Sequence, residues 1–297
     1  MTETKNLLSL KSDWVFKRIF GKEGNEDILL DLLSAILKIN IKRVELKNTE
    51  LTKNKEEQKK SILDIKAILD DNSIIDIEMQ VKNEYNMVDR TIQYLTKLYS
   101  DQLENGEDYT QTKKVIIINI LGYNLLKTNT YHTITHLKHE EHNKKEYIKL
   151  YDKEETTLTD KLEIHTIELP KFLKLKNIED SQLVEWLRLF SGKGELIKMA
   201  LSKNAKKIEK AYKELEYLSQ DKTARAEYDE YIEAKRLEKM KIQYAEEKGI
   251  AIGKDEGKKE EKIEIAKEML KSKVSIDEII KYTKLTKQEI IKLQKQI

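Results

Sequence analysis

The sequence predicts an α/β fold in which a mixed sheet is flanked by helices and followed by a long helical C-terminal extension. Over the first 200 residues the hydrophobic period changes from helical to strand-like and back. A single proline and nine glycines leave few breaks for long helices. From about residue 203 the chain is highly charged with helical spacing. The expected domains are a core at 1–202, a charged helical segment at 203–248, and a glycine-spaced linker with a small helical tail at 249–297.

The expected elements of the core follow from apolar spacing and turn residues. Asp70, Asp71 and Asn72 predict the turn of a hairpin between two strands. The run KVIIINIL is almost continuously apolar, which is typical of a strand buried on both faces. In chain order we expect helices at 12–20 and 26–38, a strand at 41–47, hairpin strands at 61–69 and 74–82, a helix at 87–104, a strand at 114–121, strands near 130–137, 145–150 and 162–168, and a helix at 180–191.

The C-terminal third predicts helices that differ in length. Residues 204–247 have helical spacing, and Gly249, Gly253 and Gly257 then recur at every fourth position, which predicts a weak joint. Three short helices are expected at 263–271, 275–282 and 286–296, packed into a small separate bundle. Such a bundle resembles a helix-turn-helix unit that grips DNA or a second copy of the chain. The alternative is a solubilising or dimerising appendage.

Composition excludes several classes of protein. The absence of cysteine excludes disulfide scaffolds, thiolate metal sites and cysteine nucleophiles. Apolar runs such as 115–121 are too short to span a bilayer, and the N-terminus lacks the pattern of a signal peptide, so we expect a cytoplasmic protein with no membrane partner. The net charge is only +2, with six Arg against fifty Lys. Any DNA binding would therefore depend mainly on the phosphate backbone, although an AT-rich genome also explains the lysine bias.

The second hairpin strand carries the residues from which a function can be argued. Alternation places Asp76, Glu78, Gln80 and Lys82 on one face and Ile75, Ile77, Met79 and Val81 on the other. Asp64 lies on the neighbouring predicted strand, so its carboxylate and that of Glu78 can converge. Two converging carboxylates are typical of a Mg²⁺ site. The alternative is an ordinary hairpin whose polar face is solvated.

The order of these motifs resembles the PD-(D/E)XK nuclease superfamily and, more narrowly, the recombination-promoting nuclease (Rpn) family of transposase-like proteins. The resemblance covers roughly residues 5–235. It rests on Asp13-x-x-Phe16-Lys17-x-x-Phe20-Gly21, Leu63-Asp64, Glu78-Met79-Gln80, Arg90-x-x-x-Tyr94 and Gly106-x-x-Tyr109. It implies a restriction-endonuclease-like core and a Mg²⁺- or Mn²⁺-dependent DNA endonuclease, linked to recombination or mobile elements in a bacterium.

The resemblance also implies roles for individual residues. Asp64 matches the metal-ligand aspartate of the superfamily and Glu78 matches its second carboxylate. Gln80 occupies the position of the superfamily's water-activating lysine, although the closer family shows glutamine there. Lys66, or Lys82, could supply the missing positive charge. The alternative reading for Lys66 is a solvated surface lysine.

Three further residues have two interpretations each. Asp13 is either an additional acidic ligand or an anchor for the first helix. Arg90 and Tyr94 lie four residues apart on one helix face, where they either contact the scissile phosphate or hold Glu78. The alternative is that Tyr94 packs in the core while Arg90 is a surface residue.

Rival functions remain open at this point. His132, His136, His139 and His142 lie within eleven residues and suggest zinc, but no specific ligand spacing supports it. His165 is expected to be a strand side chain. No phosphate-binding Gly-rich loop or Gly-x-Ser-x-Gly motif is present. The alternative to an endonuclease acting on DNA is a catalytically decayed nuclease fold that binds DNA or protein. A homo-oligomer formed through the C-terminal helices is also expected.

Overall fold

A computed structural model describes residues 7–47, 65–83, 85–138, 157–203 and 205–296. They divide into two compact units, Met1–Ala226 and Glu227–Ile297. The domain limits expected at residues 202 and 248 stay predictions.

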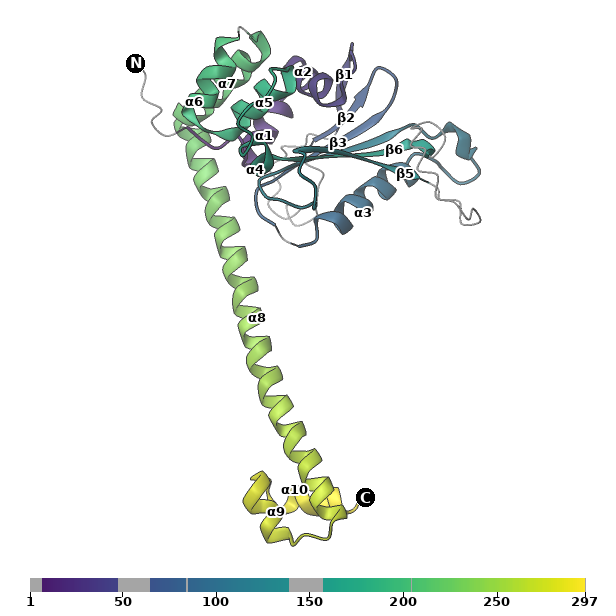
Figure 1. Cartoon of the computed structure of the whole chain (residues 1–297), viewed down its shortest axis with the longest axis vertical. Coiled ribbons are helices and arrows are strands. Elements are labelled where there is room, and N and C mark those ends of the chain that lie inside the picture. Colours follow the sequence, from purple (N-terminus) through teal and green to yellow (C-terminus); the bar gives the residue numbers. More distant parts are fainter. Residues whose placement is uncertain (1–6, 48–64, 84, 139–156, 204, 297) are drawn as a thin grey trace. The chain divides into compact units, whose positions relative to one another are not determined.

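The first unit alternates helices and strands as the sequence predicts (Figure 1). The expected strand at 145–150 and the start of the strand at 61–69 lie outside the described residues. The elements are α1 (Asp13–Phe20), α2 (Glu26–Leu37), β1 (Val44–Lys47), β2 (Ile65–Leu69), β3 (Ile74–Gln80), α3 (Met87–Ser100), a 3₁₀ turn (Tyr109–Gln111), β4 (Val115–Leu121), β5 (His132–Lys138), β6 (Thr157–Glu168), α4 (Leu169–Phe172), α5 (Gln182–Ser191), α6 (Gly194–Ser202), α7 (Lys206–Gln220) and the start of α8 (Lys222–Lys271).

The six strands form one mixed sheet in the order β1-β2-β3-β4-β6-β5. The pairs β1–β2, β2–β3 and β5–β6 are antiparallel, while β3–β4 and β4–β6 are parallel. The β2–β3 turn is made by Asn72 at φ 66°, and the Asp71 side chain accepts a hydrogen bond from the Ser73 backbone at 2.8 Å. Every residue of β4 is buried, as its apolar sequence predicts. This mixed sheet with flanking helices confirms the predicted fold class.

Helices cover both faces of the sheet (Figure 1). Helix α3 packs on one face, where Leu95 and Leu98 contact Val115 and Ile117. Helices α1, α2 and α5 lie on the other side of the sheet. Phe16 and Phe20 of α1 pack against Phe190 of α5, with ring centroids 6.1 and 5.7 Å apart. The four buried residues of α1 are apolar and lie on the side of the helix that faces the core, as the apolar spacing predicts.

Helix α3 differs from its prediction, α4 and α6 were not predicted, and the expected helical run at 204–247 is interrupted at Asp221, between α7 and α8. Helix α3 ends at Ser100 and not at residue 104, because the Gln102 side chain pairs with the backbone of Lys113, at 2.6 Å to its N–H and 3.2 Å to its C=O. These bonds draw the chain out of the helix toward β4. Helix α6 was not predicted from the sequence. Its N-terminus has no side-chain cap, so it lacks the usual start signal.

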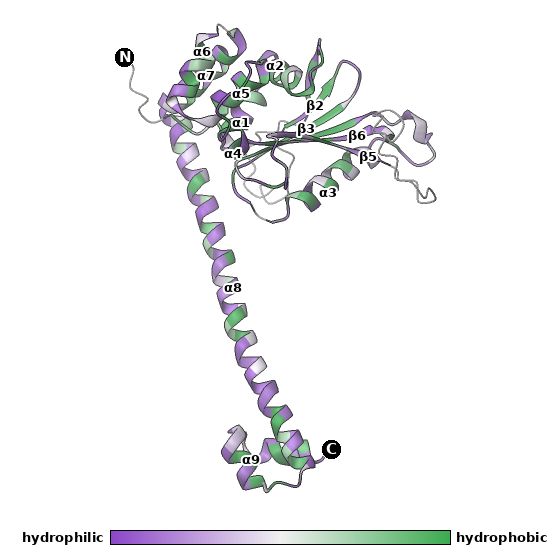
Figure 2. Cartoon of the chain, in the orientation of Figure 1, coloured by the Kyte–Doolittle hydropathy of each residue, from purple (hydrophilic) through white to green (hydrophobic). Residues whose placement is uncertain are grey.

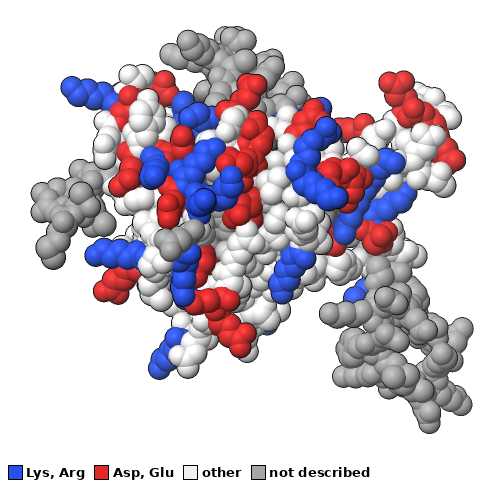
Figure 3. Space-filling view, turned by 90° about the horizontal axis from the view of Figure 1, so that it is seen from above, with Lys and Arg blue, Asp and Glu red and all other residues white. Residues whose placement is uncertain are grey.

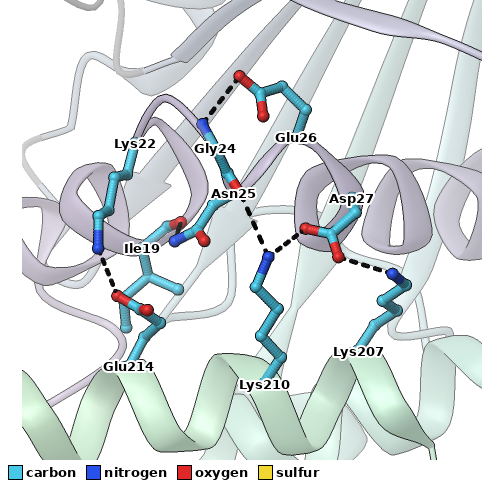
Figure 4. Close-up of polar contacts among 9 residues, drawn as sticks. All are labelled: Ile19, Lys22, Gly24, Asn25, Glu26, Asp27, Lys207, Lys210 and Glu214. Carbon is cyan, nitrogen blue, oxygen red and sulfur yellow. Dashed lines mark hydrogen bonds and ion pairs between the residues drawn. The ribbon is translucent and has the colours of Figure 1, made fainter.

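Helix α7 is joined by ion pairs to α2 and to the turn between α1 and α2 (Figure 4). Lys207 and Lys210 each contact Asp27 at 2.6 Å, and Lys22 contacts Glu214 at 2.9 Å. The two lysines lower the pKa of Asp27 to about 2 despite the opposing effect of burial. Helix α7 therefore belongs to the first unit, although its sequence is already as charged as the extension.

The second unit consists of most of α8, with α9 (Ile276–Thr283) and α10 (Lys287–Gln294). The prediction of a separate helix at 263–271 is wrong, because α8 is a single 50-residue helix that continues through Gly249, Gly253 and Gly257. Glycine weakens a helix without ending it. Polar residues predominate along α8 (Figure 2). Among the described residues, no helix is long and apolar enough to cross a membrane.

The end of α8 packs with α9 and α10, so two of the three short helices predicted for the tail are present. Ala266, at the end of α8, packs with Ile279, Leu285 and Ile290 in a small apolar cluster. Ser275 caps α9, and Thr286 with Glu289 forms the capping box predicted for α10. The bundle thus has its own core, formed by the end of a long helix and two short ones.

Candidate nuclease-type site on strand β3

Strand β3 carries two buried carboxylates on the face covered by α3. Asp76 and Glu78 are both fully shielded from solvent, and their partners in the parallel ladder are Ile117 and Asn119 of β4. The alternative of a solvated polar face on this hairpin is therefore wrong for these two residues. A buried carboxylate is retained in a fold only when a cation, hydrogen bonds or a proton compensate it.

Arg90 provides compensation for Glu78. Its guanidinium forms an ion pair with Oε2 of Glu78, while the Arg90 side chain is 23% exposed. The guanidinium carbon also lies 5.4 Å from the centre of the Tyr94 ring. The structure thus brings together three of the predicted site residues. Contact of Arg90 with a phosphate stays a prediction.

Tyr94 has a packing role as well. It is buried in the cluster formed by Leu95, Leu98 and the start of β4. Tyr94 therefore packs in the core, as in that alternative, while Arg90 is partly exposed and pairs with Glu78. The i,i+4 spacing on α3 lets one ring contribute to the core and flank the ion pair at the same time.

Gln80 and Lys66 lie on the same face of the sheet as Glu78. Gln80, the last residue of β3, is half-buried, and its amide nitrogen donates to the backbone carbonyl of Lys82 at 3.4 Å. Lys66 is half-buried and pairs in register with Asp76. Lys82 is exposed beyond the end of the strand. Gln80 and Lys66 therefore flank the two carboxylates, and their catalytic roles stay predictions.

The end of β3 is held against the end of β4 by close backbone packing. A Cβ at Gly122 would lie 2.8 Å from the backbone oxygen of Val81, closer than real Cβ contacts occur. The Gly122 N–H donates to the Gln80 carbonyl at 2.8 Å. Only glycine fits here, so the backbone around Gln80 is rigidly positioned.

Two predicted ligands have different outcomes. Asp64 lies outside the described residues. It immediately precedes Ile65, which pairs with Ile77, the neighbour of Glu78. Asp13 is the first residue of α1, which packs against β3. A carboxylate at the N-terminus of a helix interacts favourably with the helix dipole. Both interpretations of Asp13, as an additional metal ligand and as an anchor for the helix, therefore stay predictions.

Sequence reasoning missed two buried polar residues of this face. Asp76 was placed on the polar face but given no role, and Asn119 was overlooked. The available signal for Asn119 was its position as the single polar residue in the apolar run of β4. A lone amide in a strand buried on both faces requires a hydrogen-bond partner, which sets Asn119 apart from its apolar neighbours.

The donor set suits a hard divalent cation. Carboxylates at Glu78 and Asp76 are the oxygen ligands that Mg²⁺ and Mn²⁺ prefer. Over the described ranges, however, no three His, Asp or Glu side chains are grouped closely enough to hold an ion. The described carboxylates would need a further ligand, and Asp64 is the predicted one.

The histidines form a separate polar network on the opposite face of the sheet. His165 of β6 contacts Glu163 at 2.6 Å and His132 of β5 at 2.9 Å, and Glu163 also contacts Lys114 at 2.7 Å. Burial, reinforced by His165, lowers the pKa of His132 to about 4. His165 is a strand residue, as predicted. His139 and His142, two of the four residues in the zinc alternative, lie outside the described residues.

Comparison with known proteins identifies a family. A family model described as PD-(D/E)XK nuclease family transposase matches residues 10–245. No curated protein and no solved structure matches the chain significantly. The match covers every described element from α1 to α7 and the first part of α8.

Proposed function

The chain belongs to the PD-(D/E)XK nuclease family transposases, and on this premise we propose that it is a divalent-metal-dependent DNA endonuclease that hydrolyses backbone phosphodiesters. Membership links it to nucleases of mobile elements. The observation that carries the proposal is the buried Glu78 carboxylate on β3, paired with Arg90 and flanked by Asp76 and Gln80. A structural carboxylate would not need so many polar neighbours on one strand face.

Asp64 and Glu78 would hold the cation, Mg²⁺ or Mn²⁺, with Asp13 as an additional ligand. When bound, such an ion lowers the pKa of a ligated water and neutralises charge on the phosphate. Asp76, fully buried two residues before Glu78, places a second carboxyl group at this face.

Gln80 orients the attacking water through its amide, in the position where the superfamily has lysine. An amide can orient water by hydrogen bonds but adds no positive charge. Lys66, paired in register with Asp76, supplies that charge. Arg90 holds Glu78 in place through the ion pair, and Tyr94 supports the Arg90 guanidinium. Arg90 is partly exposed, so the same guanidinium could also contact the scissile phosphate.

DNA is the proposed substrate, and its phosphates are the main point of contact. Basic residues are almost all lysine, which acts as a point charge toward phosphate. Figure 3 shows Lys and Arg interspersed with Asp and Glu on the face that it draws. Affinity on that face would therefore be modest and strongly salt-dependent. The tail bundle, α9 and α10 with the end of α8, is proposed to add DNA binding or self-association.

A second candidate function is favoured by one observation, the glutamine at position 80. A nuclease fold that has lost its lysine could bind DNA or protein without cleaving. Cleavage of supercoiled plasmid by the full chain in Mg²⁺ or Mn²⁺ separates the two functions. We expect nicked or linear product from the wild type and none from Asp64→Ala or in EDTA. Equal cleavage by Asp64→Ala would refute the proposed endonuclease site, and no cleavage with any divalent metal would favour the binding module.

A further inference from the structure

Asn119 is the polar residue of β4 that lies beside Glu78 in the sheet. The two are partners in the parallel ladder and share the face covered by α3. Asn119 is 1% exposed, and its Nδ2 donates to Oγ1 of Thr91 on α3 at 3.1 Å. This hydrogen bond joins the first turns of α3 to the strand next to the carboxylate, beside the Arg90–Glu78 ion pair.

Thr91 fixes how the Asn119 amide is oriented. Its hydroxyl is 4% exposed and donates to the Met87 carbonyl at 2.7 Å, so its lone pair is what accepts from Asn119. The amide oxygen, Oδ1, is the other polar atom of the Asn119 side chain. It is buried and has no hydrogen-bond partner among the residues that the structure describes. A buried carbonyl without a donor is destabilising, so this arrangement is poor for stability.

The position of Thr91 connects this hydrogen bond to the ion pair. Thr91 directly follows Arg90, whose guanidinium contacts Glu78. In the apolar cluster with β4, α3 contributes Tyr94, Leu95 and Leu98, all C-terminal to Thr91, and apolar contacts alone tolerate small rotations of a helix. A directional bond at Thr91 sets the rotation of the first turns and therefore the direction of the Arg90 side chain.

We propose that Asn119 and Thr91 are positioning residues of the nuclease site, which hold α3 so that Arg90 meets Glu78. The inference rests on the proposed function, since it assigns these residues to that site. It differs from a structural role in one respect that can be measured. The unpaired amide oxygen means that the bond is kept at a cost in stability, as is usual where function takes precedence.

The variant Asn119→Leu separates the two roles. Leucine has a similar volume and removes the buried oxygen, while the Thr91 hydroxyl keeps its bond to Met87. We expect the melting temperature in EDTA to stay equal or rise, while the affinity for Mn²⁺, measured by calorimetry, falls by about 10-fold or more, the usual scale for residues that orient ligands. A fall in melting temperature with unchanged Mn²⁺ affinity would overturn the proposal.

Thr91 offers a rescue and a matched control. Thr91→Val removes the hydroxyl and Thr91→Ser retains it, so only the valine variant should lose Mn²⁺ affinity. Thr283 in the tail bundle has the same 2.7 Å bond to the carbonyl four residues earlier and is 2% exposed. Thr283→Val should leave Mn²⁺ binding unchanged. Equal losses for Thr91→Ser and Thr91→Val would refute the role of the hydroxyl.

Arg90 itself can be observed without any cleavage. The chain has only six arginines, so the Nε–Hε signals of ¹⁵N-labelled full-length protein are few, and Arg90→Lys assigns one of them. We expect Asn119→Leu to shift the Arg90 signal and leave the other five in place. An unchanged Arg90 signal refutes the proposal even if the wild type cleaves DNA. A shifted signal supports it even if the wild type fails to cleave, which would refute the proposed function alone.

Discussion

Replacing Arg90 with methionine should destabilise the first unit in a way that divalent cations repair. The ion pair couples Arg90 to a fully buried carboxylate, and methionine keeps an apolar stem of similar length beside Tyr94. What the variant loses is the positive charge. Glu78 then lacks its arginine partner in a site of low polarity.

The size of the loss can be worked out from the burial of the two partners. Breaking a fully buried ion pair costs about 3–5 kcal/mol. Because Arg90 is 23% exposed, water compensates part of this, and we expect about 2–3 kcal/mol. For a unit of this size that corresponds to a melting temperature lowered by roughly 5–10 °C in EDTA. A cation at 100 times its dissociation constant stabilises any variant that keeps the site by about 2.7 kcal/mol. Removing the arginine charge beside Glu78 should tighten cation binding, so Arg90→Met should gain more than the wild type.

Tryptophan fluorescence is a suitable assay, because the only tryptophans, Trp14 and Trp186, both lie in the first unit. Arg188 provides the matched control. It forms a buried ion pair with Glu185 at 2.6 Å, on α5 and apart from the site. Arg188→Met should also lower the melting temperature, but its gain from Mg²⁺ or Mn²⁺ should equal that of the wild type, because its cation site is unchanged.

Either of two results would contradict the prediction for Arg90→Met. One is an Arg90→Met protein as stable as the wild type in EDTA, which would mean that Arg90 does not stabilise the buried carboxylate. The other is a destabilised variant whose melting temperature gains no more from Mn²⁺ than the wild type or Arg188→Met. That result would mean that Glu78 does not lie where a cation binds.

Three further predictions follow from the site and the tail. In single-turnover assays, Gln80→Ala should lower the cleavage rate by about 10²-fold, and Gln80→Lys should keep or raise that rate. A Gln80→Ala variant as fast as the wild type would exclude a role for Gln80 in positioning water. The lowered pKa of His132 means that the unfolded chain binds more protons than the folded chain between pH 6.5 and 4. The stability that depends on neutral His132 is complete above pH 6.5 and should fall by about 2–3 kcal/mol toward pH 4. Urea titrations should show a flatter dependence of stability on pH for His132→Gln. Deleting residues 249–297 should leave metal-dependent cleavage intact while DNA affinity, measured by anisotropy, or oligomeric state changes; loss of cleavage in a folded truncation would place the tail in the active unit.

Much of the fold could be predicted because it follows local rules. The alternation of β3, the continuous apolar run of β4 and the caps at Ser275 and Thr286 are each visible in a few adjacent residues. The unbroken α8 could not be predicted with the same rules. Its glycines lower helix propensity, but charged neighbours on both sides still favour helix and nothing ends it.

The site could be predicted only in part. The polar face of β3 and the i,i+4 pair on α3 follow from periodicity, and the pairing of Arg90 with Glu78 was one of two roles expected from that spacing. The burial of Asp76 and the bond from Asn119 to Thr91 depend on the order of strands in the sheet. Parallel neighbours such as β3 and β4 are separated by a helix in the sequence, so their register leaves no local signal.

The most direct test of the central claim compares the wild type with Glu78→Gln in one experiment on DNA. Glutamine keeps the shape of the side chain and removes the charge that would bind the cation. Plasmid cleavage in Mg²⁺ and DNA binding in Ca²⁺ are measured on the same folded preparations. The account predicts that Glu78→Gln binds DNA like the wild type and cleaves it at least about 10²-fold more slowly. Cleavage by Glu78→Gln at the wild-type rate would contradict it.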